Sequence, residues 1–128
     1  MTTTAESVEI SDPATIEETM LHNLSLSLGD MAEEMVYELA PMFIEDAKDN
    51  LTQIHQAIGA GNCAQISKLA HTLKGSSGNM GLLHFSSMCA SVMQAARSDD
   101  LTSVRSWWPK LIAEYKCIHQ VLLKYSNQ

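Results

Sequence analysis

The chain has 128 residues, 45% of them apolar, which is enough for one packed core but not for two. Its formal net charge of −7 argues against a nucleic-acid partner, because such a partner requires a basic surface. The charge is uneven: residues 1–50 hold twelve acidic residues and one lysine, whereas the remainder holds three acidic and seven basic residues. Such asymmetry is typical of a solvated acidic face, and it can also bias how a partner docks.

No feature of the sequence indicates export or membrane insertion. The first eleven residues contain no Lys or Arg and no apolar run, so we expect no secretory signal. No apolar stretch approaches the roughly 20 residues of a membrane helix. The three cysteines, Cys63, Cys89 and Cys117, are widely spaced and odd in number, which favours a reducing compartment. We therefore expect a cytoplasmic protein without a membrane partner.

The N-terminal part predicts a tail and one short helix. Residues 1–11 are rich in Thr, Ser and Glu, which is typical of a flexible tail. Asp12 as the N-cap and Pro13 at the first helical position predict a helix that runs to about Leu24. The folded domain is accordingly expected to comprise residues 12–128.

A second, longer helix is predicted from Met31 to Ile58, after a start signal at Gly29–Asp30. Its apolar residues recur at spacings of three and four, which describes one helical stripe. These residues are Val36, Leu39, Phe43, Ala47, Leu51, Ile54 and Ile58. Pro41 interrupts the pattern and should kink the helix or shift its start. The glycines of segment 59–61 end it.

Two more helices follow at short intervals. Asn62 caps the third helix, with Gln65 placed for a capping box, and the helix runs to about Gly78. The fourth helix is predicted over Leu82–Ala96, where apolar residues again share one side.

A fifth helix opens at Asp99–Asp100. Its apolar residues alternate spacings of three and four, as in the seam of a packed bundle. They are Leu101, Val104, Trp108, Leu111, Tyr115, Ile118, Leu122 and Tyr125. Pro109 lies inside this pattern, so the helix is expected to be kinked or broken after Trp107, and only one of the two adjacent tryptophans can face the core. No strand-like alternation occurs. The sequence therefore predicts an all-α fold, an antiparallel four-helix bundle with an additional short N-terminal helix.

The third helix contains the candidate site. At about 100° per residue, its apolar residues lie on one side and His71 lies on the opposite side. The helical neighbours of His71 are Ser67, Lys68, Lys74, Gly75 and Gly78. A neutral imidazole can attack a phosphoryl group, and phosphoryl transfer depends mainly on positioning and charge neutralisation. Lys74 and Lys68 could supply the charge. A glycine inside a helix lowers helix stability by about 1 kcal/mol relative to alanine. We expect this loss to be tolerated at Gly75 because the absence of a side chain leaves the imidazole accessible.

The segment from His71 to Ser77, HTLKGSS, followed by Gly81, resembles the signature of histidine-containing phosphotransfer (HPt) domains. Other landmarks of that family are matched by Gly29–Asp30, Phe43, Leu51, Gly61–Asn62, Cys89 and Asp99–Asp100. The resemblance extends from about Gly29 to Leu123. One departure is Met93, which stands where the family often has an acidic residue; we interpret this position as a surface detail of docking.

The resemblance implies a free-standing, monomeric phosphorelay intermediate without kinase activity of its own. His71 would be the phosphoacceptor, and Lys74 and Gly75 would admit the partner's active site. The partners would be response-regulator receiver domains, including that of a hybrid sensor kinase. No cofactor is expected on this chain, because nothing near His71 looks like a metal ligand, and the catalytic Mg²⁺ is expected on the receiver.

Partner docking could involve residues of the same ridge and of the first two helices. On the ridge the candidates are Ser67, Gly78 and Asn79. Met31, Met35 and Leu24 could form an exposed apolar patch beside the ridge. Burial of Met31, Met35 and Leu24 in the core is an equally good interpretation.

Three other functions fit the sequence less well. A metal bundle is disfavoured because the remaining histidines, His22, His55, His84 and His119, lie on different predicted elements and form no Glu-x-x-His pair. An autonomous kinase is disfavoured because no glycine-rich nucleotide loop is present. A non-catalytic helical adaptor remains the main alternative, although the presence of His71 weakens it.

Overall fold

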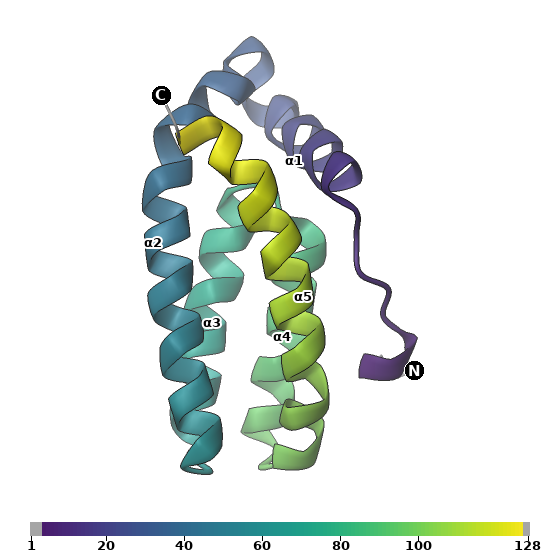
Figure 1. Cartoon of the computed structure of the whole chain (residues 1–128), viewed down its shortest axis with the longest axis vertical. Coiled ribbons are helices and arrows are strands. Elements are labelled where there is room, and N and C mark those ends of the chain that lie inside the picture. The colour runs from purple at the N-terminus through teal and green to yellow at the C-terminus, as the bar shows by residue number, and fades with distance from the viewer. Residues whose placement is uncertain (1–3, 127–128) are drawn as a thin grey trace.

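The computed structural model describes residues 4–126 and consists mainly of helices (Figure 1). Five α-helices follow one another: α1 (Pro13–Leu28), α2 (Ala32–Gly59), α3 (Cys63–Asn79), α4 (Leu83–Arg97) and α5 (Leu101–Ser126). Short 3-10 turns, η1 (Ala5–Ser7) and η2 (Gly29–Met31), precede α1 and α2. Within residues 4–126 there is no strand, and the predicted all-α class is confirmed.

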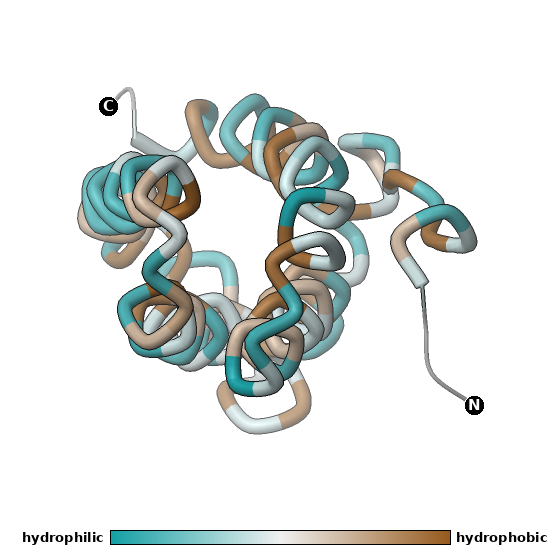
Figure 2. The backbone as a smooth tube through the Cα atoms, turned by 90° about the horizontal axis from the view of Figure 1, so that it is seen from below, coloured by the Kyte–Doolittle hydropathy of each residue, from teal (hydrophilic) through white to brown (hydrophobic). Residues whose placement is uncertain are grey.

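Helices α2 to α5 form an antiparallel four-helix bundle. Each connection between them is three residues long, so consecutive helices must run in opposite directions side by side. Contacts between α2 and α5 close the ring. Figure 2 looks along the bundle and shows the helices arranged around one shared interior. Helix α1 packs mainly against α5 and slants across one end of the bundle, which agrees with the predicted additional helix (Figure 1).

The helix starts follow the predicted capping chemistry. The side chains of Asp12, Asn62 and Asp100 each accept a hydrogen bond from the backbone N–H three residues later, at 2.8, 3.1 and 3.1 Å. These bonds satisfy donors that have no partner inside the helix. They also lower the pKa of the exposed Asp12 carboxyl, because hydrogen bonds from the backbone and side chain of Thr15 favour its ionised form.

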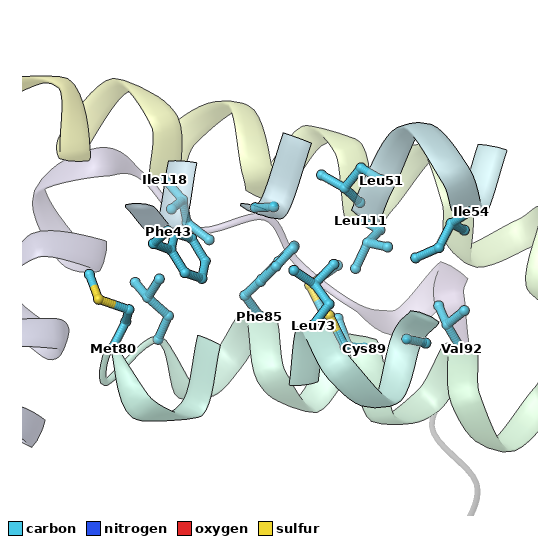
Figure 3. Packing of buried hydrophobic residues seen from close by; sticks show 14 of the residues in the cluster. Phe43, Leu51, Ile54, Leu73, Met80, Phe85, Cys89, Val92, Leu111 and Ile118 are labelled. Atoms are coloured by element: carbon cyan, nitrogen blue, oxygen red, sulfur yellow. The ribbon is translucent and has the colours of Figure 1, made fainter. Parts of the chain in front are cut away.

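A single core fills the bundle. All five helices contribute buried apolar residues to it. Figure 3 shows side chains of α2, α3, α4 and α5 meeting there, among them Phe43, Leu73, Phe85 and Leu111. The predicted apolar stripes therefore face the interior of the bundle.

No helix described between residues 4 and 126 is long and apolar enough to cross a membrane.

Two prolines lie inside continuous helices, so of the two alternatives predicted at Pro109, a kink or a break after Trp107, the break does not occur. Pro41 is in α2 and Pro109 is in α5, and both side chains are exposed. A proline removes one backbone hydrogen bond and strains one turn. Here the helix continues because buried residues on both sides of each proline, such as Ala40 and Phe43 around Pro41, hold it against the bundle.

The buried face of α5 is wider than its predicted seam. Trp107 is 4% exposed, whereas Trp108, which was assigned to the seam, is only partly buried. Glu114 is also buried. The reason is that α5 packs against α4, α2 and α1 at once, so no single stripe describes its contacts.

The N-terminal segment lies against the bundle. Ala5 is buried, and Val8 and Ile10 pack on the core. The Ser11 N–H donates to Glu114, and a ring nitrogen of His84 lies 3.1 Å from the Glu9 carbonyl oxygen. A flexible tail was expected for residues 1–11. Residues 1–3 of this segment lie outside the described part of the chain. Residues 4–11 run along the surface of α4 and α5.

Candidate functional site

The orientation of α3 places His71 on the outer surface. Ile66, Leu69, Leu73 and Met80 are buried, as the helical pattern predicted, and they fix the inward side of the helix. His71 is about 160° around the helix from Leu73, at 100° per residue, and its side chain is exposed. The imidazole is therefore reachable from solvent without any rearrangement of the core.

The residues one turn from His71 leave its surroundings open and positively charged. Lys68 is exposed and Lys74 is partly buried. Apart from its chain neighbours and the adjacent backbone of α3, a Cβ atom placed on Gly75 would have no heavy atom within 4 Å, so the space above this glycine is free. Gly75 is thus not required by packing inside the protein. Its missing side chain leaves room for something that approaches from outside.

The backbone beneath this ridge is held by two serines. The carbonyl oxygen of Lys74 accepts hydrogen bonds from Ser86 Oγ at 2.8 Å and from Ser77 Oγ at 3.1 Å. Ser86 belongs to α4, so this bond ties the ridge to the neighbouring helix. Ser77 is fully buried and also donates to the Leu73 carbonyl at 2.7 Å. Neither serine was predicted to have a role; the role of Ser77 could have been found, since it lies four residues after the buried Leu73.

Gly81 has a packing role that its position in the sequence motif did not reveal. Its φ of +78° is in the left-handed region, and a Cβ atom there would lie 2.8 Å from the Met20 carbonyl oxygen. Helix α1 therefore packs directly on the α3–α4 turn. In contrast, a Cβ atom on Gly78 would make only an ordinary contact, 3.6 Å from Ser86 Oγ.

The docking candidates separate into exposed and buried residues. Asn79 and Met31 are exposed, and Ser67, Gly78 and Met35 are partly exposed. Of the two alternatives predicted for Leu24, an exposed patch or the core, the structure supports the core. Its side chain is 7% exposed because it packs over the α-carbon of Gly81. Leu26, which is not among the predicted docking residues, is 76% exposed on the same helix.

Met31 and Met35 do not lie level with His71. Because α2 is eleven residues longer than α3 and antiparallel to it, its N-terminal part projects past the end of α3. Met35 belongs to this projecting part, and Met31, in η2, precedes it. Both therefore lie beyond the end of α3 at which Asn79 is found.

The remaining histidines have separate surroundings. His55 stacks on Trp108 and His119 stacks on Tyr115, with ring centroids 5.6 and 6.0 Å apart. His22 is exposed on α1. Among residues 4–126, no three His, Cys, Asp or Glu side chains come together in a group that could hold a metal ion.

Two residues of the family pattern on α4 are buried. Cys89 is fully buried, and burial raises the pKa of its thiol far above the ordinary value. Met93 is 5% exposed and belongs to the core. The interpretation of position 93 as a surface docking detail is therefore wrong for this chain.

A four-helix bundle that presents an exposed histidine between two lysines and an open glycine defines a class of protein, the helical phosphocarriers. The model of the Hpt domain family matches residues 38–121, and the chain belongs to this family. Its role is histidine phosphotransfer in a phosphorelay. The matched range contains α3 to α4 completely but excludes α1 and η2.

One solved structure supports the fold. The crystal structure of histidine-containing phosphotransfer protein B from Pseudomonas aeruginosa PAO1 superposes with a TM-score of 0.69. The match covers 82% of this chain and 88% of that chain at 23% sequence identity. At this identity the likeness shows a common fold. A comparison with curated protein sequences finds no match.

Proposed function

We propose that His71 is the phosphoacceptor, and that it receives a phosphoryl group from the aspartate of one receiver domain and passes it to the aspartate of another. The observation that supports this assignment is the exposed His71 on α3, with Lys68 and Lys74 one turn away and open space above Gly75. Receiver domains are the partners that Hpt family membership implies. A hybrid sensor kinase is the source that we propose for the first receiver.

The transfer needs little covalent chemistry from this chain. The unprotonated ring nitrogen of His71 attacks phosphorus in line with the acyl-phosphate bond. A P–N bond forms, the P–O bond to the aspartate breaks, and the aspartate leaves as a carboxylate. The ammonium groups of Lys74 and Lys68 neutralise phosphoryl charge, while the partner provides the Mg²⁺ that such transfers use.

The chain is proposed to act as a monomeric carrier in the cytoplasm. Its three cysteines are free thiols, which suits a reducing compartment. We propose no kinase activity of its own and no cofactor bound to it. The competing proposal is an adaptor that binds receivers through the same surface but takes no phosphate.

The test is phosphoryl transfer from a panel of phosphorylated receiver domains to the native chain and to His71→Gln. We expect acid-labile labelling of the native chain and none of His71→Gln, with both proteins equally helical. His22→Gln is the matched control because His22 is also exposed, and it should label normally. ATP and Mg²⁺ alone should label neither protein. Binding of a receiver without any transfer to the native chain would favour the adaptor.

A further inference from the structure

The part of α3 that follows His71 is intrinsically a weak helix. Gly75 and Gly78 lie in its last two turns, and glycine is the poorest helix former after proline. Packing requires neither glycine, because a Cβ atom would meet no neighbouring element at Gly75 and would make only an ordinary contact at Gly78. The same stretch contains Lys74, whose ammonium is proposed to neutralise phosphoryl charge. Additional contacts must therefore keep its backbone in place.

Two hydroxyl groups provide such contacts at one carbonyl oxygen. The Lys74 carbonyl oxygen accepts a hydrogen bond from Ser77 Oγ at 3.1 Å and another from Ser86 Oγ at 2.8 Å. Ser77 belongs to the same helix, so its bond moves with α3. Ser86 belongs to α4, and its bond is the only side-chain hydrogen bond that joins α3 to α4 among residues 4–126. Ser86 is therefore the residue that fixes the Lys74 backbone to a second element.

The fold explains why Ser86 reaches this carbonyl. Lys74 and Ser86 each lie six residues from Met80, which is in the turn between the two helices. Antiparallel helices joined by a short turn bring such residues side by side. A Cβ atom on Gly78, one turn after Lys74, would lie 3.6 Å from Ser86 Oγ. The Ser86 hydroxyl therefore lies over the turn of α3 that contains both glycines.

The direction of the Ser86 bond is unusual for a serine inside a helix. Such serines commonly donate to a carbonyl three or four residues earlier in the same helix. Ser91, also on α4, does so, with its Oγ 3.3 Å from the Ser87 carbonyl oxygen. Ser86 donates across to α3 instead, over a shorter distance. Its hydroxyl thus serves the neighbouring helix rather than its own.

A fixed carbonyl at Lys74 also fixes the direction in which the Lys74 side chain leaves the backbone. The carbonyl and the Cα–Cβ bond belong to the same residue, so a small rotation of this residue moves the ammonium at the far end of the side chain by more. A charge stabilises a transition state best when it is positioned beforehand and needs no reorganisation. Misplacement of a catalytic group by about 1 Å can slow a reaction about 100-fold.

We propose that Ser86 is a positioning residue for phosphoryl transfer. Its hydroxyl holds the Lys74 backbone, and thereby keeps the Lys74 ammonium where it neutralises the phosphoryl group beside His71. The inference rests on the proposed function and adds to it a residue on a different helix from the phosphoacceptor. Ser86 takes no part in the chemical step, in which the P–N bond forms at His71 and the P–O bond to the aspartate breaks.

The test is single-turnover transfer from one phosphorylated receiver domain, chosen as the best donor to the native chain, over a range of acceptor concentrations. Ser86→Ala removes the hydroxyl, and Ser86→Thr keeps one at the same position. Ser91→Ala is the matched control, because it removes from the same helix a hydroxyl that bonds within that helix. Ser86→Ala is also combined with Lys74→Ala, since a double-mutant cycle shows whether one residue acts through the other.

We expect the maximal rate to fall about fivefold in Ser86→Ala while the half-saturating concentration stays within about twofold of the native value, because positioning of Lys74 acts in the transition state and not in docking. Ser86→Thr and Ser91→Ala should keep the maximal rate within about twofold of the native value. In the Lys74→Ala background, loss of the Ser86 hydroxyl should change the rate less than about twofold. A purely structural role of Ser86 would lower the rate in both backgrounds alike.

If Ser86→Ala does not fold, Ser86→Cys replaces it, because a thiol has a similar size but donates only weakly, and the same loss is expected. Four results would overturn the inference. They are a native maximal rate in the folded variant, a loss in Ser86→Thr or Ser91→Ala as large as in Ser86→Ala, an equal loss with and without Lys74, and a rise in half-saturation alone, which would make Ser86 a docking contact. Failure of the proposed function looks different. In that case the native chain itself accepts no phosphoryl group from any receiver, and the positioning inference is refuted together with it.

Discussion

The backbone N–H of Ser11 donates to Oε1 of Glu114 at 2.8 Å, and thereby joins two residues that lie 103 positions apart in the chain. Glu114 is 1% exposed, in the middle of α5. A carboxylate that leaves water needs hydrogen-bond donors, and Ser11 provides one at the point where the N-terminal segment enters α1. This bond fixes the start of α1, as Glu17 fixes its middle and Gly81 its end.

Glu114→Ala should lower the free energy of unfolding by about 2–3 kcal/mol, because it leaves the Ser11 N–H without an acceptor and opens a cavity. Glu114→Gln keeps an acceptor oxygen and most of the volume, so its loss should be about 1 kcal/mol. Urea titrations of the three proteins at one pH measure the difference. Equal losses in both variants would mean that the hydrogen bond to Ser11 contributes nothing.

The ion pair of Glu17 predicts a dependence of stability on pH. The hydrogen bonds from Lys124 and Tyr125 lower the pKa of the Glu17 carboxyl below its ordinary value of 4.5. A carboxyl with a lowered pKa in the folded state stabilises the protein above pH 4.5 and loses this contribution as the pH falls through the folded value. Since the Lys124 side chain is 62% exposed, the contribution should be only about 0.5 kcal/mol.

Glu17→Gln should therefore cost about 0.5 kcal/mol at pH 7, and the difference from the native chain should shrink towards pH 3. Urea titrations at several pH values measure this difference. Glu18→Gln is the control, because Glu18 is exposed and forms no salt bridge within residues 4–126. A difference for Glu17→Gln that stays constant down to pH 3 would contradict the assignment.

Local signals predicted most of the architecture. The caps Asp12 and Asn62 start helices where expected, because a cap depends on residues only three positions away. The inward side of α3 was predicted correctly, and with it the exposure of His71, since a helical period orients every side chain once the buried stripe is known. The helix to Leu24 was predicted one turn too short, because α1 continues to Leu28.

The errors and the open alternatives concern contacts between elements that are distant in the chain. Leu24 is buried because Gly81, 57 residues later, has no side chain to keep it away. Glu114 is buried because the N-terminal segment covers it with a donor. No periodicity within one helix contains such information. In the sequence, Gly81 stood out only as part of a motif. In the structure, α1 occupies the space that a side chain at position 81 would need, which explains the glycine.

Gly75 offers a test in which stability and transfer change in opposite directions. Gly75→Ala should stabilise the protein by about 1 kcal/mol, because alanine is the better helix former and its Cβ meets no atom within 4 Å beyond the adjacent backbone of α3. Gly75→Gln should also fold, but its longer side chain occupies the space beside His71 and should slow transfer from a receiver at least tenfold. Thermal unfolding and rapid-quench transfer measure the two effects. Normal transfer by Gly75→Gln would show that the open space has no function.

Lys74 and Lys68 lie one turn on either side of His71, and they differ in how firmly they are held. The Lys74 side chain is partly buried, and its carbonyl oxygen accepts the hydrogen bond from Ser86, whereas Lys68 is exposed. A partly buried side chain has less conformational entropy to lose when its ammonium meets the phosphoryl group. In the free protein both charges are screened, and each should contribute about 1 kcal/mol or less.

In the docked complex water is excluded, and a positioned ammonium should count for more in the transition state. Lys74→Ala should therefore fold normally and still accept phosphate, but transfer about tenfold more slowly, equivalent to ~1.4 kcal/mol. Lys68→Ala should lose about twofold, as expected for a screened charge. Rapid-quench transfer from the same phosphorylated receiver gives the rates of both variants. At high salt the effect of Lys68→Ala should vanish, because salt screens an exposed charge, whereas the effect of Lys74→Ala should persist. Equal losses for the two variants would mean that only general electrostatics operates at this site. Native rates in both would leave the two lysines without a role in transfer.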